Sequence, residues 1–227
     1  MRNSMYHPAA WIWFAAALFI LLGDTALLHA KDDPAQLYPE TISVLQKLHA
    51  SEVQAHLRYL SFAKVAIADG HTNIAHMFKA LAASESIHAK NFKRILSSLG
   101  SATTSIDPSS ITTSTTKENL KFATNVELSE IDVEYPRYIK RISGEAHEEA
   151  LKYIKYAWQA EHQHRDLIKE IRSGTGMFFS MLLKRFRGRD GKYYVCQNCG
   201  STVTELPQQA CPICYRTLDI YVEVPKP

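Results

Sequence analysis

The sequence predicts a mainly α-helical protein in which a four-helix bundle precedes a small β-rich metal domain. Four long stretches carry apolar residues at helical spacing, and their apolar faces contain glutamates and histidines. All four cysteines fall between residues 196 and 214, in two Cys-x-x-Cys pairs. The composition, 46% hydrophobic and 22% charged, excludes a disordered chain, a collagen-like chain and a multi-span membrane protein. The formal net charge of +3 removes the electrostatic case for binding nucleic acid.

The first thirty residues have the pattern of a secretory signal peptide. Arg2 precedes an apolar run over residues 9–22, and Ala30 provides the small residue at the cleavage position. The run is shorter than the roughly 20 residues that a membrane-spanning helix needs. We therefore expect cleavage after Ala30 and export of residues 31–227, with the periplasm as the expected compartment. An uncleaved membrane anchor is the alternative.

Four helical stretches follow this leader. They are expected at about residues 39–69, 72–99, 115–143 and 145–172. Thr115 and Glu118 form a capping-box pattern at the start of the third helix, and Pro136 is expected to kink it. The Ser- and Thr-rich segment 101–115 is too polar to pack and is expected to be a long crossover or exposed loop.

The second and fourth helices each carry a glutamate and a histidine three positions apart on their apolar faces. These residues are Glu85 with His88 and Glu161 with His164. Residues three and four apart share one face of a helix, so these side chains point in the direction of the neighbouring leucines and isoleucines. The positions therefore face the core rather than solvent, and each histidine is expected to bind one metal ion.

The first and third helices add three carboxylates to the same core, Glu52 and the pair Glu127 and Glu130. Burying so many carboxylates without a counter-charge is prohibitive, and metal cations remove that cost. One glutamate from each of two helices, combined with Glu-x-x-His from each of two others, is the pattern of dinuclear carboxylate bundles. Glu52 precedes Glu85 by 33 residues and Glu127 precedes Glu161 by 34, which indicates an internal repeat.

The composition of this ligand set favours particular metals and particular bridging residues. Oxygen-rich ligation with one imidazole per metal suits iron or manganese better than copper or structural zinc. Glu85 and Glu161 are the expected bridging ligands because each lies beside a histidine on opposing helices. His49 and His56 flank Glu52 on the first helix. We interpret them as core residues hydrogen-bonded to carboxylates, with a role as additional ligands as the alternative.

The cysteine pairs, Cys196 with Cys199 and Cys211 with Cys214, are separated by eleven residues. Two such turns close on one tetrahedral metal ion, and thiolates accept either iron or zinc. The alternative is a pair of disulfides, which an oxidising compartment would permit. The glycine after Cys199 and the proline after Cys211 favour the metal site.

The chain is therefore divided into four parts. They are a signal peptide (1–30), the helical bundle (31–174), a linker (175–190) and the cysteine domain (191–227). The linker is first apolar and then basic. We interpret it as a helix packed on the bundle, with a peripheral membrane contact through residues 177–189 as the alternative.

Together these motifs resemble the rubrerythrin family over nearly the whole mature chain. The matching segments are Glu52–Tyr59, Glu85–His88, Glu127–Glu130 with Tyr135 and Pro136, Glu161–His164 and Tyr194–Gly200. The resemblance implies a ferritin-like di-iron four-helix bundle followed by a rubredoxin-like domain. One departure is Tyr215, which follows Cys214 where such domains usually carry a small residue.

The resemblance also implies an activity, namely a non-haem peroxidase that reduces hydrogen peroxide to water in the response to oxidative stress. Electrons would pass from an iron held by four cysteines to the di-iron site, between subunits of a homodimer, and would come from an exported donor. The implied metal ligands are Glu52, Glu85, His88, Glu127, Glu130, Glu161 and His164 in the bundle, and Cys196, Cys199, Cys211 and Cys214 in the second domain.

Four residues receive further roles from the resemblance. One iron would exchange Glu130 for His88 as the oxidation state changes, and Glu130 would supply a proton when it is released. Tyr59 and Tyr135 would donate hydrogen bonds to the ligating carboxylates, with core packing as the alternative. Two other functions stay open: a ferroxidase that handles iron, and a non-enzymatic binding module in which zinc only clips the cysteine domain.

Overall fold

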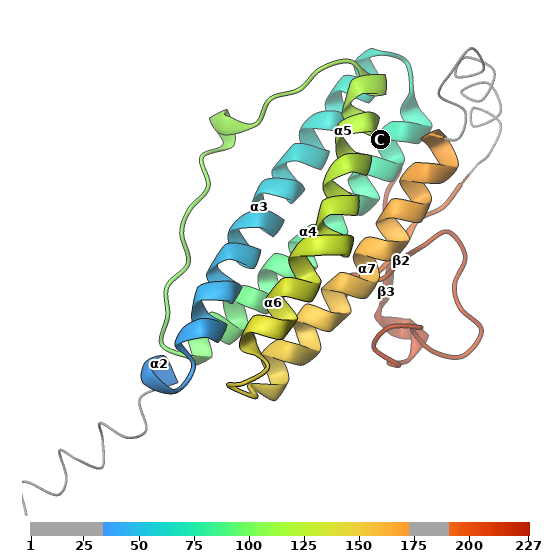
Figure 1. The fold of residues 1–227 in the computed structure, drawn as a ribbon. Helices are drawn as coiled ribbons and strands as arrows, with labels where there is room; N and C mark the ends of the chain where they lie inside the picture. Colours follow the sequence, from blue (N-terminus) through green and yellow to red (C-terminus); the bar gives the residue numbers. More distant parts are fainter. Residues whose placement is uncertain (1–33, 173–190) are drawn as a thin grey trace, which may run out of the picture.

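The computed structural model describes residues 34–172 and 191–227. Figure 1 shows long helical segments lying side by side as a bundle, which confirms the predicted fold class. The helices are α2 (Pro34–Leu37), α3 (Pro39–Ala68), α4 (Thr72–Ser98), the short 3₁₀ turn η1 (Pro108–Ser110), α5 (Thr116–Ser129), the π-helix η2 (Glu130–Glu134), α6 (Tyr135–Ile142) and α7 (Glu148–Arg172). The consecutive segments α5, η2 and α6 together make the third rod of the bundle.

Helix ends follow the local sequence signals closely. The Thr115 side chain accepts a hydrogen bond from the Glu118 amide, and the Glu118 carboxylate accepts one from the Thr115 amide, so the predicted capping box is confirmed. The fourth helix begins at Glu148 rather than at Glu145. The reason is that Glu145 caps another helix: its two carboxylate oxygens accept the amides of Glu40 (2.8 Å) and Thr41 (2.7 Å) at the start of α3.

A π turn interrupts the third rod just before Pro136, where the sequence predicts a kink. The amide of Tyr135 donates to the carbonyl of Glu130, five residues back. The next carbonyl, that of Ile131, would need the amide of Pro136, which proline lacks. The indole Nε1 of Trp158 on α7 donates to that carbonyl instead, at 3.0 Å. A side chain of the neighbouring helix therefore supplies the hydrogen bond that the π turn lacks.

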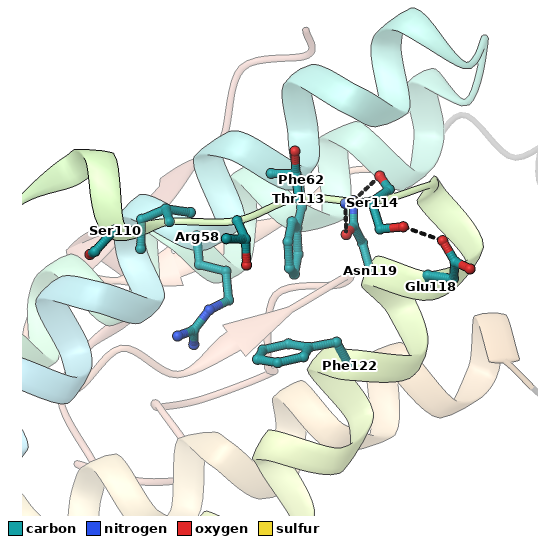
Figure 2. A pocket seen from close by; sticks show the side chains of 10 residues that line it. Arg58, Phe62, Ser110, Thr113, Ser114, Glu118, Asn119 and Phe122 are labelled. Atoms are coloured by element: carbon teal, nitrogen blue, oxygen red, sulfur yellow. Dashed lines mark hydrogen bonds between the residues drawn. The ribbon is translucent and has the colours of Figure 1, made fainter.

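Residues 101–115 form the predicted crossover, which follows the length of the bundle between α4 and α5 (Figure 1). The crossover and the start of α5 border a pocket of about 240 Å³ that is also lined by Arg58, Phe62 and Phe122 (Figure 2). The Arg58 guanidinium lies 5.0 Å from the centre of the Phe122 ring. None of the predicted metal ligands lines this pocket, so it is not the metal site.

Two apolar clusters fill the bundle, one on each side of the predicted ligand positions. One cluster includes Ala55, Leu81 and Ile168 and the other includes Leu48, Phe92, Ala150, Ile154 and Ala157. Along α3, α4 and α7 the glutamates and histidines fall between members of the two clusters. The polar layer is therefore enclosed by apolar side chains along the axis of the bundle.

The cysteine domain is a small antiparallel sheet with the strand order β2-β1-β3. Its elements are β1 (Tyr194–Cys196), β2 (Thr202–Val203), the 3₁₀ turn η3 (Leu218–Ile220) and β3 (Tyr221–Glu223). Tyr194 pairs with Val203 on one side and with Glu223 on the other. The predicted β-rich domain is thus confirmed, and Figure 1 shows it beside α7.

The cysteine domain contacts the bundle of the same chain through several polar groups. Asn91 donates a side-chain hydrogen bond to the carbonyl of Asn198 (2.8 Å). The amide of Thr202 donates to the side-chain oxygen of Gln163 (3.0 Å). These bonds join the domain to both α4 and α7.

The predicted signal peptide (1–30) and linker (175–190), with its possible membrane contact through 177–189, lie outside the described residues. None of the helices that the structure describes is long and apolar enough to span a membrane.

Candidate metal centres

The bundle brings six of its seven predicted ligands into two overlapping groups. The first group is Glu52, Glu85, His88 and Glu161, and the second is Glu85, Glu127, Glu161 and His164. Within each group the ligand atoms lie within 4.8 Å of one another. Glu85 and Glu161 belong to both groups, which is the position that two bridging carboxylates require.

Both histidines face the carboxylates with Nδ1. In His88 this atom lies 3.0 Å from Glu85 Oε2 and 3.3 Å from Glu161 Oε1. In His164 it lies 2.9 Å from Glu161 Oε2 and 3.2 Å from Glu85 Oε1. The symmetry of these contacts reflects the internal repeat, because α4 and α7 each contribute one Glu-x-x-His pair.

Burial and mutual repulsion of the carboxylates favour cations in this cluster. Burial raises the pKa of Glu52 to about 8, and burial followed by the negative charges of Glu161 and Glu85 raises the pKa of Glu127. Burial also opposes ionisation of Glu161, but His164 and His88 outweigh it and lower the pKa of that carboxyl. The protein alone thus keeps protons on part of the cluster, whereas metal ions would replace those protons.

A buried carboxylate oxygen without a hydrogen-bond partner also indicates that the cluster binds cations. Glu127 Oε2 is buried and has no hydrogen-bond partner among the described residues. A buried, unsatisfied carboxylate oxygen is costly unless a ligand binds it. Together with the oxygen-rich donor set, this atom shows that the residues present fit two metal ions of the iron or manganese type.

Two buried tyrosines fix the orientation of ligating carboxylates. The hydroxyl of Tyr135 donates to Glu52 Oε1 at 2.5 Å, and the hydroxyl of Tyr59 donates to Glu127 Oε1. Both rings are almost fully buried. The contacts are those that the resemblance implied, and hydrogen bonds of this kind typically orient metal ligands.

Glu130, the seventh predicted bundle ligand, lies outside both groups. It opens the π turn η2 and is partly buried, and its Oε1 lies 3.4 Å from the hydroxyl of Ser51. π turns inside helices are frequent at functional sites. The sequence predicts Glu130 but neither the π turn nor Ser51. Pro136 is the local signal of an irregular helix.

His49 and His56 belong to neither ligand group. His56 Nδ1 lies 2.7 Å from the carbonyl of Ala82, so this ring is engaged by backbone rather than by a carboxylate. His49 is buried, and its Nδ1 has no hydrogen-bond partner within residues 34–172 and 191–227. Burial and the charge of Lys93 lower the pKa of His49, which favours a neutral ring.

The four cysteines form a second centre. The sulfurs of Cys199 and Cys211 are 3.5 Å apart and those of Cys196 and Cys214 are 3.7 Å apart. A disulfide needs about 2.05 Å, whereas four thiolates around one metal ion at about 2.3 Å lie roughly 3.8 Å apart. The separations therefore fit a tetrahedral iron or zinc site.

The two centres meet at His88. Its Nε2 lies 3.2 Å from the carbonyl of Cys199. If Nε2 carries the proton and donates to that carbonyl, Nδ1 is left as the lone-pair atom that faces the carboxylates. One imidazole thus connects a ligand of the cysteine centre with the carboxylate cluster, a contact that no sequence motif predicts.

Gly200 allows this close approach. A Cβ at this position would lie 2.3 Å from His88 Nε2 and 2.7 Å from the hydroxyl of Ser84, and φ is +78°. Ser84 donates to the carbonyl of Gly200 at 2.6 Å. Any larger residue would separate the cysteine domain from α4, so the glycine serves the contact between the centres as well as the turn.

Comparison with known proteins gives one consistent result. The rubrerythrin family model matches residues 43–172. The chain is 30% identical over 174 residues to Rubrerythrin-2 of Clostridium acetobutylicum, covering 77% of this chain and 91% of that protein. It is 25% identical over 181 residues to nigerythrin of Nitratidesulfovibrio vulgaris, covering 80% and 85%. The structure of fully reduced, all-ferrous nigerythrin matches with a TM-score of 0.68 at 26% identity, covering 81% of this chain and 86% of that one.

Removing the Tyr135 hydroxyl tests its role at the metal site. Tyr135→Phe keeps the buried ring but leaves Glu52 without its donor, so we expect metal affinity of the bundle to fall by about 10- to 100-fold. Tyr138→Phe is the matched control, because Tyr138 lies on the same helix and its hydroxyl lies 3.5 Å from the Arg137 guanidinium. Titration of both variants with ferrous or cobalt ions measures the metal affinity of the bundle. Equal affinities would show that the Tyr135 hydroxyl does not contribute to metal binding.

Proposed function

The chain belongs to the rubrerythrin family, and from this premise we propose that it is a peroxidase that reduces hydrogen peroxide to water. Members of this family are oxidoreductases with a di-iron site. The observation that carries the proposal is the contact of His88 Nε2 with the carbonyl of Cys199, which couples a thiolate redox site to the carboxylate cluster. Each peroxide consumes two electrons and two protons and yields two water molecules.

The residues of the bundle would bind and orient the reacting groups. When bound in the carboxylate cluster, two iron ions supply the Lewis acidity and the two electrons that the reduction needs. Glu85 and Glu161 would hold both metal positions at a fixed separation, and Tyr59 and Tyr135 would fix the outer carboxylates. Glu130 lies beside the cluster without belonging to either ligand group, a position that suits a carboxyl group delivering a proton to the departing oxygen.

Electron supply to the cluster would come from the four-cysteine site of the same chain. The resemblance implies delivery between subunits of a homodimer, whereas the contact between the centres forms here within one chain. Exchange of cysteine domains between two subunits would build the same contact. A specific activity that stays constant on dilution would support delivery within one chain, and a loss on dilution would support the dimer.

The oxidant that reoxidises the protein faster distinguishes a peroxidase from a ferroxidase. The iron-loaded protein is reduced without air, and substoichiometric hydrogen peroxide or air-saturated buffer is then added. We expect faster reoxidation by peroxide, with the ferric-thiolate absorption recovering in step. Faster reoxidation by oxygen would instead support iron handling. A colourless protein with zinc between the cysteines would contradict electron relay through that site.

Replacement of Gly200 tests the contact between the two centres. In Gly200→Ala the added methyl meets His88, and such overpacking costs about 1–3 kcal/mol. We expect both sites to keep their iron while recovery of the thiolate absorption after peroxide becomes slower. Gly70→Ala is the control, because Gly70 has a similar φ of +77° with open space around it. Equal recovery rates in the two variants would contradict the proposed route.

We also propose that the protein is exported, on the basis of the signal-peptide pattern in residues 1–30. The intact mass of the protein purified from cells that express the full chain tests this proposal. A mature protein beginning at Lys31 and recovered from the exported fraction is expected. A full-length mass in the membrane fraction would indicate an uncleaved anchor.

A further inference from the structure

The pocket under the crossover is separate from both metal centres and is large enough for a small organic molecule. Its volume of about 240 Å³ exceeds that of an apolar cavity of about 150 Å³, which can hold benzene. A single ring with a small substituent therefore fits. The walls come from three segments: Arg58 and Phe62 of α3, residues 110–114 of the crossover, and Glu118, Asn119 and Phe122 of α5 (Figure 2).

Two phenylalanine rings form the apolar wall of this pocket. The rings of Phe62 and Phe122 lie edge to face, with their centres 6.2 Å apart and their planes at 86°. Phe62 is almost fully buried, whereas Phe122 is 46% exposed. Aromatic rings attract further rings in offset or edge-to-face contacts. The wall therefore suits a flat apolar group, which would bury the exposed part of Phe122.

A guanidinium group without a carboxylate partner lies at the same wall. Arg58 Cζ is 5.0 Å from the centre of the Phe122 ring. Within residues 34–172 and 191–227 this guanidinium makes no ion pair and donates no hydrogen bond. Its N–H groups form a planar fork that matches the two oxygens of a carboxylate. The pocket thus places an unpaired positive charge next to an aromatic surface.

The acidic residue of the pocket is already engaged by its own helix end. The Glu118 carboxylate accepts hydrogen bonds from the hydroxyls of Ser114 and Thr115 and from the amide of Thr115. The bonds from Ser114 and Thr115 lower the pKa of Glu118. Figure 2 shows this side chain turned toward Ser114, on the far side of the pocket from Arg58. Arg58 is therefore the charge that selects a ligand, and it selects an anion.

The crossover adds hydrogen-bond donors to the pocket. In the described part of the chain, the amides and hydroxyls of Thr112 and Thr113 donate no hydrogen bond. The amide of Ser114, in contrast, donates to Asn119 Oδ1 at 2.9 Å, and Asn119 Nδ2 donates back to the carbonyl of Ser114 at 2.9 Å. The crossover is thus fixed to α5 next to residues whose donors are free. Long connections with little secondary structure of their own are often binding loops.

We propose that this pocket binds a small aromatic carboxylate, with its ring against Phe62 and Phe122 and its carboxylate on the Arg58 guanidinium. A neutral ring would leave Arg58 unpaired, and a small inorganic anion would leave Phe122 exposed. Only a ligand with both parts uses both features of the wall. Binding involves no covalent or redox step, so this inference does not depend on the proposed peroxidase activity.

Binding of benzoate to the full chain, loaded with zinc, tests the proposal. Isothermal titration calorimetry measures the affinity, and the backbone amide resonances of residues 110–114 should shift as the ligand binds. Arg58→Gln removes the charge and Phe122→Ala removes one ring of the wall. Neither side chain is buried, so the fold should persist in both variants. We expect each variant to bind benzoate about tenfold more weakly than the wild type.

A second arginine provides a matched control for the charge. Arg137 Cζ lies 5.1 Å from the centre of the Tyr138 ring, which is the same arrangement outside this pocket. Arg137→Gln should bind benzoate with the wild-type affinity. Two further probes separate the parts of the ligand, because benzyl alcohol has the ring without the charge and acetate has the charge without the ring. Each should bind about tenfold more weakly than benzoate.

Three results would overturn the proposal. The first is equal affinity of benzoate for the wild type and Arg58→Gln, which would place the ligand elsewhere, for example on a metal ion. The second is equal affinity of the wild type for acetate and benzoate, which would indicate a site for any anion. The third is the absence of saturable benzoate binding to the wild-type chain.

Discussion

Mutual repulsion among carboxylates in an apolar interior is the constraint on which the rest of this structure depends. Glu52, Glu85, Glu127 and Glu161 converge in the middle of the bundle, and each is almost fully buried. Their charges cannot all persist there without cations, which is why burial raises the pKa of Glu52 and Glu127. The two histidines offset only part of this repulsion. The bundle therefore requires cations at its centre, and its two apolar clusters enclose that site.

The strength of this constraint explains how much could be predicted from the sequence. A glutamate at an apolar position of an amphipathic helix is conspicuous, and Glu85 with His88 and Glu161 with His164 repeat the pattern. The capping box at Thr115 and the glycines after the first two helices are local signals, so the ends of those elements followed as well. Local patterns and the resemblance to a known family thus gave the fold class and the ligand candidates.

The features that the sequence does not predict depend on contacts between residues far apart in the chain. α7 starts three residues later than the sequence predicts because Glu145 caps α3, across more than a hundred residues. The π turn before Pro136 is satisfied by Trp158 on another helix. The approach of Gly200 to His88 depends on how the cysteine domain docks, and no local pattern encodes that orientation.

The bond from Trp158 to the π turn has a spectroscopic consequence. The chain has three tryptophans, and the other two, Trp11 and Trp13, lie in the leader segment. In a chain that begins at Lys31, as the proposed cleavage would leave it, the tryptophan emission arises from a single indole, that of Trp158. Its Nε1 is bound to the carbonyl of Ile131, the residue next to Glu130. Tryptophan fluorescence of that shortened chain would therefore report on the segment that carries Glu130, the one predicted bundle ligand outside the two ligand groups.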